Sequence, residues 1–358
     1  MDLLVKTRRK AITAFGAGAL GLLFVFQDTT PRRSSLRSTA LASQPTLCKF
    51  RAYVPSAWEG KWEADIDTMY SQDSICPAMQ QSSGMAKLWL AGVSSCKQNG
   101  ASCGDNLSTQ VFSKFVKTCL PSSATGLRGS GGGRALSPMV VVEEFIEPLV
   151  GHMRHPYALS KCTPPDIPAV DVQDRSYLLM LGDGIKAVRA RHPGRAILVD
   201  AGTNKFESSL GYLLPTYAAL GIHFDAIYAW EAQPADPSEY WASVPADVKP
   251  RLHFYNAPVT PEPGSSMNPV DWIRNMYRPG DFIVFKLDID NDNVESALIQ
   301  QVLDMDGAED IIGEMYFEKH YTATDMKPYF GTPDTKYPAA VRLMQALRKK
   351  GVRVHYWP

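Results

Sequence analysis

The sequence lacks several patterns that identify whole classes of protein. It has no internal repeat, no Cys-X-X-Cys pair and no basic patch with interleaved aromatic residues. The missing cysteine pairs argue against a zinc site of the common structural type, and the missing basic patch argues against nucleic acid as a partner. The formal net charge is zero, although residues 1–45 carry seven basic and two acidic side chains. The remainder of the chain is therefore mildly acidic.

A candidate membrane segment lies near the N-terminus, and it is short. Residues 11–26 are uncharged and would extend over about 24 Å as a helix, against about 30 Å of bilayer hydrocarbon. Gln27 or a thinner early-secretory membrane closes this gap. The basic residues before the run predict a cytosolic tail (1–10), a signal anchor (11–27), a stem (28–45) and a lumenal catalytic domain.

This arrangement describes a single-pass type II protein of the Golgi or endoplasmic reticulum membrane. Secretion after cleavage of a signal peptide stays open, and so does a plastid location, since residues 31–42 are rich in Arg and Ser and free of acids.

The six cysteines all precede the apolar runs described below, the last being Cys162. An even number in a loop-rich region predicts disulfides in an oxidising compartment, but fifteen pairings are possible. Residues 46–120 form this Cys-containing region, with helices expected near 63–70 and 109–117, and Asn106 begins a glycosylation sequon. A Gly/Ser-rich linker (121–138) follows.

The catalytic domain is expected over residues 139–358. A helix is expected over 140–155, whose His152 and His155 are further candidates for the site. Five apolar runs then read as buried strands: 197–201, 224–230, 251–255, 281–287 and 310–317. Helical spacing is found over 208–220 and in a segment that begins near Glu295 and reaches Met305. This alternation predicts an α/β fold with a doubly wound, mostly parallel, Rossmann-like sheet covered on both faces.

Polar residues follow the ends of these runs. Asp200 and Gly202 end the first run, and Glu231 ends the second, about thirty residues later, where nucleotide-binding folds place an acid on the ribose. Asp288 and Asp290 follow the fourth run, and Glu318 and His320 follow the fifth. Ligands of open parallel sheets bind beyond the carboxyl ends of the strands, so these residues are the candidate site.

Five short stretches carry a family resemblance. They are Val-Asp-Ala-Gly-Thr-Asn at 199–204, Ala-Trp-Glu-Ala-Gln-Pro at 229–234, Phe-Lys-Leu-Asp-Ile-Asp at 285–290, Glu-Met-Tyr-Phe-Glu-Lys-His at 314–320 and Gly-Val-Arg-Val-His-Tyr-Trp-Pro at the C-terminus. Together they resemble the FkbM-like S-adenosylmethionine-dependent methyltransferases, in the variant found behind membrane anchors in algae and other eukaryotes. The resemblance covers residues 140–358.

The resemblance implies S-adenosyl-L-methionine as cofactor and a class I methyltransferase fold. It implies that Asp200, Gly202 and Asn204 face the methionine part of the cofactor, that Glu231 binds its ribose and that Asp288 lies at the mouth of the site. The acceptor would be a hydroxyl of a glycan, a glycolipid or a small molecule. Two departures from the family pattern, Lys205–Glu207 after the first loop and Asn291–Val294 after the fourth strand, leave an inactive binding protein with this fold as an alternative.

Methyl transfer to a hydroxyl benefits from a general base. The candidates are Asp290, Glu318 and His320, and this interpretation assigns no metal ligand. The Asp288-Ile289-Asp290 sequence also permits a metal-dependent glycosyltransferase, because hard carboxylate oxygens suit Mg²⁺ or Mn²⁺ on a nucleotide-sugar.

Overall fold

The computed structural model describes residues 47–69, 72–99, 107–120, 139–151, 153–154, 162, 171, 173–182, 184–322 and 333–358. Residues 42–358 form one compact unit. The expected tail, anchor, stem and linker lie outside the described residues, as do Asn106, His152 and His155. Within the described part of the chain, no helix has the length and apolar character needed to cross a bilayer.

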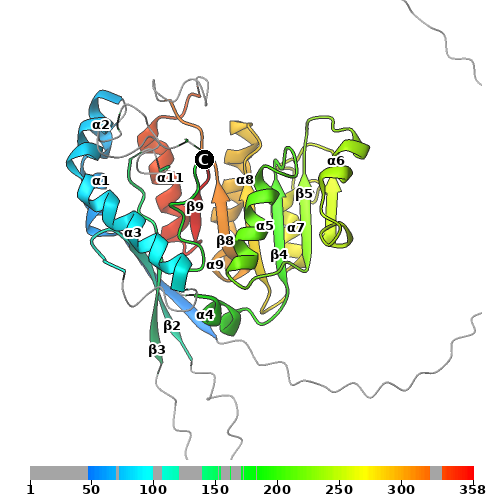
Figure 1. The fold of residues 1–358 in the computed structure, drawn as a ribbon, viewed down its shortest axis with the longest axis horizontal. Coiled ribbons are helices and arrows are strands. Elements are labelled where there is room, and N and C mark those ends of the chain that lie inside the picture. The colour runs from blue at the N-terminus through cyan, green and yellow to red at the C-terminus, as the bar shows by residue number, and fades with distance from the viewer. Residues whose placement is uncertain are drawn as a thin grey trace, which may run out of the picture. The chain divides into compact units, whose positions relative to one another are not determined.

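A six-stranded parallel sheet organises the C-terminal part of this unit (Figure 1). Its strand order is β6-β5-β4-β7-β8-β9, and every neighbouring pair is parallel. This confirms the expected α/β class and parallel sheet. The order is that of a doubly wound sheet, whose direction of winding reverses between β4 and β7. The strands are β4 (Ala196–Ala201), β5 (Ala226–Trp230), β6 (Leu252–Tyr255), β7 (Phe282–Leu287), β8 (Ile312–Phe317) and β9 (Val354–Tyr356).

Helices cover both faces of this sheet (Figure 1). Helix α5 lies on one face, and α7, α8 and α11 form a layer on the other, where α8 contacts both neighbours. Local signals set the helix starts: Asn268 and Asn291 cap α7 and α8 through their side chains, and Asp236 caps α6. The helices of this part are α4 (Gly184–Arg191), α5 (Ser209–Ala219), α6 (Pro237–Ser243), α7 (Pro269–Met276), α8 (Asp292–Asp304), α9 (Ala308–Ile311) and α11 (Tyr337–Lys349), with a 3₁₀ turn at Lys249–Arg251.

The N-terminal part corrects two sequence expectations. Residues 109–117 and 140–155 were expected to be helical, but β2 (Ser113–Cys119) and β3 (Val140–Ile146) are strands. Together with β1 (Cys48–Val54) they form an antiparallel sheet in the order β1-β2-β3. In β2 the buried residues Ser113 and Phe115 are two positions apart, which is the spacing of a strand and not of a helix. β3 begins with three β-branched valines, which favour strands.

Three helices stand beside this small sheet: α1 (Ala57–Ala64), α2 (Gln72–Gln81) and α3 (Ser83–Asn99). The helix expected near 63–70 is thus the end of α1 followed by a 3₁₀ turn at Ile66–Thr68. Disulfides join Cys48 to Cys119 and Cys76 to Cys162, and Cys96 is also disulfide-bonded. The expectation of disulfides therefore agrees with the structure.

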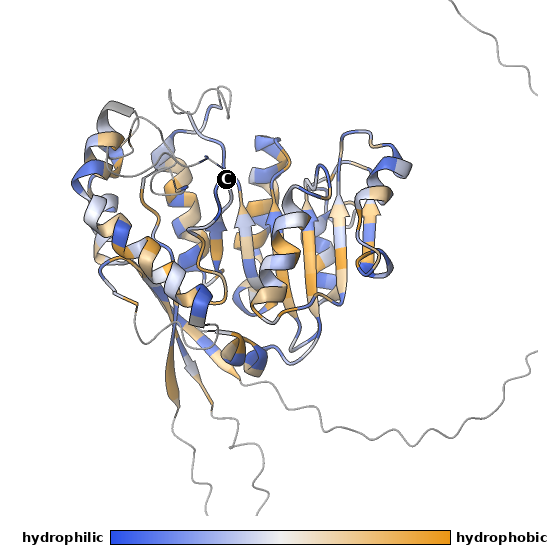
Figure 2. Cartoon of the chain, viewed as in Figure 1, coloured by the Kyte–Doolittle hydropathy of each residue, from blue (hydrophilic) through white to orange (hydrophobic). Residues whose placement is uncertain are grey.

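One hydrophobic core runs through both parts. It extends from Trp58 and Trp89 in the N-terminal helices to Trp357 at the C-terminus. Figure 2 shows hydrophobic residues concentrated in the central strands of the parallel sheet. Hydrogen bonds from the fully buried Arg348 of α11 also connect the two parts. Its guanidinium donates to the Tyr53 hydroxyl at 2.9 Å and to the Glu147 carbonyl at 2.8 Å.

Candidate functional site

The candidate site lies where the loops after β4, β5 and β7 meet, at the switch point of the sheet. Gly202 has φ +87°, and a Cβ at this position would lie 1.6 Å from the Asp288 carbonyl oxygen. The Gly202 amide donates to the Trp230 carbonyl at 2.9 Å, and the Asp288 amide donates to the Ala201 carbonyl at 3.0 Å. Only glycine permits so close an approach of the three loops.

A buried ion pair supports these loops from below. Asp200 and Lys286 are direct partners in the register of β4 and β7. The Lys286 ammonium lies 3.3 Å from the Asp200 carboxylate and 2.9 Å from that of Asp288, and it donates to the Gly202 carbonyl at 2.5 Å. Burial alone would lower the pKa of Lys286, but the two carboxylates raise it above its usual value. Lys286 is therefore protonated, and its contacts hold the loops after β4 and β7 together beneath the cavity.

Lys286 was not among the predicted site residues. The available signal was a lysine in an otherwise apolar strand, a position where an unpaired charge is too costly to bury. Asp200, which the resemblance places beside the cofactor, lies below the cavity. Its carboxylate is fully buried, accepts from the Ser209 hydroxyl at 2.5 Å and is not among the described residues that line the cavity above it.

A cavity of about 240 Å³ opens above this pair. Four of the five predicted cofactor residues line it, namely Gly202, Asn204, Glu231 and Asp288, and the predicted base Asp290 lies at its edge. Apolar walls come from Trp230, Pro258, Val259 and Ile289. A neighbouring cavity of about 370 Å³ shares Asn204, Glu231 and Gln233 with the first.

Glu231 stands between the two cavities. Its carboxylate accepts from the Asn204 amide at 2.6 Å and from the Gln233 amide at 2.7 Å. Asn204 has φ +52°, a left-handed conformation that asparagine tolerates better than most residues. Glu231 thus fixes the loop after β4 in a conformation that exposes the cavity.

The three predicted catalytic side chains come together at the ends of β7 and β8. The His320 Nε2 atom lies 3.5 Å from the Glu318 carboxylate and 3.6 Å from that of Asp290. Arg154 donates to the same Glu318 oxygen that His320 approaches, with 3.0 Å between its guanidinium and that oxygen. Arg154 carries no local sequence signal, because 164 residues separate it from its partner.

Electrostatics differentiate the acids of this cluster. Burial raises the pKa of Glu318, and the adjacent Asp288 carboxylate adds to that effect. Burial also favours neutral Asp288, but the Lys286 ammonium, a hydrogen bond with Glu318 and the nearby His320 together lower the pKa of Asp288. Burial opposes protonation of His320, whereas Glu318, Glu295 and Asp290 together raise its pKa. His320, whose pKa is raised, therefore stands near the Asp288 carboxylate, whose pKa is lowered.

The same cluster has the composition of a cation site. One donor atom each from Asp290, Glu318 and His320 lies within 4.8 Å of the others. Mixed nitrogen and oxygen donors suit a divalent transition ion. The Asp288 carboxylate contacts Lys286 at 2.9 Å and is not one of these three donors.

Glu295, which follows the departure from the family pattern, is nearly fully buried at the start of α8. It accepts from the Ile289 amide at 3.0 Å, and burial raises its pKa to about 7. Its contact shapes the loop after β7.

Comparison with known proteins adds no identification. No protein-family model matches the chain, and neither curated proteins nor solved structures give a match. The fold and the site define an α/β protein with a six-stranded parallel sheet and an acidic pocket at its switch point.

Proposed function

We propose that this protein is an S-adenosylmethionine-dependent O-methyltransferase with a class I methyltransferase fold. The observation that carries the proposal is one cavity at the switch point lined by both Gly202 and Glu231. A glycine loop after the first strand of the sheet and an acid after the second are what a ribose-containing cofactor requires. The identity of the cofactor rests on the FkbM-like resemblance.

The residues present fit this cofactor. Gly202 lets the Asp288 backbone approach the loop after β4, and both residues line the cavity. Glu231 is the candidate acceptor of ribose hydroxyl hydrogen bonds, while Trp230, Pro258 and Val259 offer an apolar wall for a base. The bound cofactor supplies an activated sulfonium methyl group.

The role of the protein is then to position the acceptor and remove its proton. Proximity supplies much of the rate for such a reaction. His320 is the proposed base, and Glu318 and Asp290 would stabilise the imidazolium that forms when it takes the hydroxyl proton. Asp288 is held ionised by the adjacent Lys286 ammonium and adds negative charge beside this group.

The acceptor class and the location belong to the same proposal. A sugar hydroxyl of a glycan or glycolipid is the acceptor that the family resemblance implies, and a Golgi or endoplasmic reticulum lumen is the compartment in which the disulfides would form. A membrane anchor at residues 11–27 would hold the enzyme there.

A second candidate is a metal-dependent glycosyltransferase. The convergence of Asp290, Glu318 and His320 favours it, because these donors can hold a divalent cation on a nucleotide-sugar diphosphate. Glu231 would serve the ribose of a nucleotide-sugar equally well, but the FkbM-like resemblance does not support this candidate, and for this reason we place it second.

Calorimetric titration tests the choice. We expect saturable binding of S-adenosylmethionine to the full-length chain produced in an oxidising compartment, with binding lost in Glu231→Ala and kept in the exposed control Glu262→Ala. Binding of a nucleotide-sugar that requires Mn²⁺, without binding of S-adenosylmethionine, would establish the second candidate instead.

A further inference from the structure

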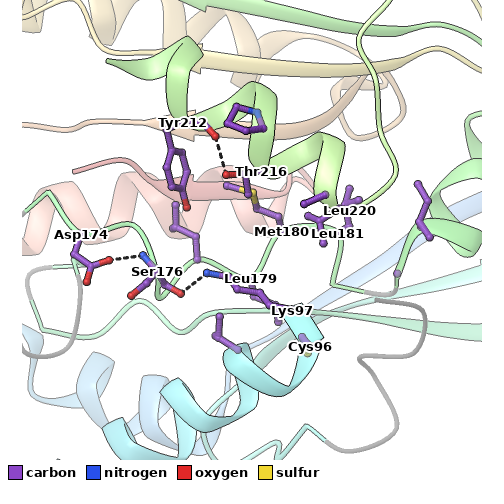
Figure 3. Close-up of a pocket in the computed structure, with 16 residues that line it drawn as sticks. Cys96, Lys97, Asp174, Ser176, Leu179, Met180, Leu181, Tyr212, Thr216 and Leu220 are labelled. Atoms are coloured by element: carbon purple, nitrogen blue, oxygen red, sulfur yellow. Dashed lines mark hydrogen bonds between the residues drawn. The ribbon is translucent and has the colours of Figure 1, made fainter. Parts of the chain in front are cut away.

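A separate cavity of about 490 Å³ lies between α3, the segment 174–185 and α5 (Figure 3). Its volume is within the range of about 300–1,000 Å³ that is typical of small-molecule sites. None of its described lining residues belongs to the candidate site.

The wall of this cavity is largely apolar. Leu178, Leu179 and Leu181 form its buried side, and Leu220 of α5 lies at the same end as Leu181 (Figure 3). The hydroxyls on the opposite wall already have partners within the protein. Tyr212 donates to the Arg175 carbonyl at 3.0 Å, and Thr216 donates to the Tyr212 carbonyl at 2.7 Å. The wall therefore suits an apolar ligand better than a polar one.

Polar groups gather at one end of the cavity. Asp174 and Ser176 lie toward Tyr212, and the Ser176 amide donates to the Asp174 carboxylate at 2.7 Å (Figure 3). The Lys97 ammonium donates to the Ser176 carbonyl at 2.7 Å. A ligand that fits this distribution has an apolar chain and a polar head.

Arg175 connects the polar end of the cavity to the C-terminal residues. Arg175, between the two polar residues just named, stacks its guanidinium 4.0 Å above the centre of the Trp357 ring. The Arg175 guanidinium also donates to the Pro358 carbonyl at 3.2 Å, so this end of the cavity is tied to the C-terminus.

We infer that this cavity binds the alkyl or acyl chain of an amphiphile, with its head at the Asp174–Ser176 end. That the amphiphile is the methyl acceptor, a glycolipid for example, rests on the proposed function. Binding of the chain itself does not rest on it.

The test is titration of the full-length chain with hexyl, octyl and decyl β-glucosides below their micellar concentrations. Burial of each added methylene contributes about 0.8 kcal/mol, so the dissociation constant should fall about fourfold per carbon. Ala219 is exposed on α5 and lines the cavity, so Ala219→Trp should fill the cavity and abolish binding. Ala218→Trp, one residue away and not among the lining residues, is the matched control.

The outcomes separate the two proposals. Affinity that does not change with chain length, or equal binding by Ala219→Trp and the wild type, would overturn the cavity inference even where S-adenosylmethionine binds. Chain-length-dependent binding that Ala219→Trp removes supports the inference. If S-adenosylmethionine then fails to bind, the cavity still binds the amphiphile, but the amphiphile is not a methyl acceptor.

Discussion

Asp200 and Lys286 face one another across β4 and β7, with 3.3 Å between carboxylate and ammonium, and both are buried. A buried pair contributes little net stability, but removal of one partner leaves an uncompensated charge. We expect Lys286→Met to lower the free energy of unfolding by about 3–5 kcal/mol. Urea denaturation measures this, with the exposed Lys249→Met as control. A loss equal to that of the control would show that the ammonium is not required.

Gly202 allows a prediction that separates backbone strain from steric collision. Gly202 and Gly264 both have positive φ, +87° and +80°, but only Gly202 has an atom in the way of a Cβ. Gly264→Ala should cost roughly 1–2 kcal/mol of stability from φ alone. Gly202→Ala should cost more, and its S-adenosylmethionine binding should be lost. Thermal melting and calorimetry of the two variants would show whether the loop contact matters.

Glu231 is expected to contribute to both the loop and the cofactor. A hydrogen bond to a charged group contributes about 1.5–3 kcal/mol, so Glu231→Gln should weaken S-adenosylmethionine binding by roughly 10- to 150-fold. Calorimetry at fixed pH gives this ratio. Unchanged affinity would mean that the carboxylate serves only the Asn204 and Gln233 amides that it accepts from.

The parallel sheet is predictable because most of its strands are short apolar runs that end at a polar residue. The apolar runs locate β4 and β7 to within one residue, and the switch-point rule then predicts that Asp290, Glu318 and His320 gather at one edge of the sheet, as they do. The topology accounts for the proximity of these three side chains, since the carboxyl ends of neighbouring parallel strands lie at the same edge of the sheet.

The missed elements depend on contacts that a local pattern does not encode. β2 and β3 are half-buried strands with residues 121–138 between them in the sequence. Neither strand is recognisable without knowledge that it pairs with the other. Arg154 and Arg348 are likewise interpretable only with their distant partners, Glu318 and Glu147. Lys286 differs from these residues, because its local sequence already indicated its role. A lone lysine in a buried strand requires an acid nearby.

The pH dependence of methyl transfer tests the proposed base. A protonated His320 cannot accept a proton, so the rate should rise with pH through the His320 pKa, which lies above its ordinary value of 6.5. In Glu318→Gln the midpoint should move to lower pH, because Glu318 is the leading group that offsets burial and raises this pKa. A rate profile with an alkyl glucoside as acceptor measures the shift. An unmoved midpoint would exclude His320 as the titrating base.

Cations distinguish a base from a metal site at Asp290, Glu318 and His320. A metal ligand must be deprotonated, and a histidine bound to a cation has no lone pair left for an acceptor proton. If His320 is the base, removal of metals with EDTA should leave methyl transfer unchanged, and Mn²⁺ should inhibit more strongly as the pH rises. Asp290→Asn should relieve that inhibition, because it removes the most exposed of the three donors. Activity that EDTA abolishes and Mn²⁺ restores would make these residues a cation site and would favour the glycosyltransferase.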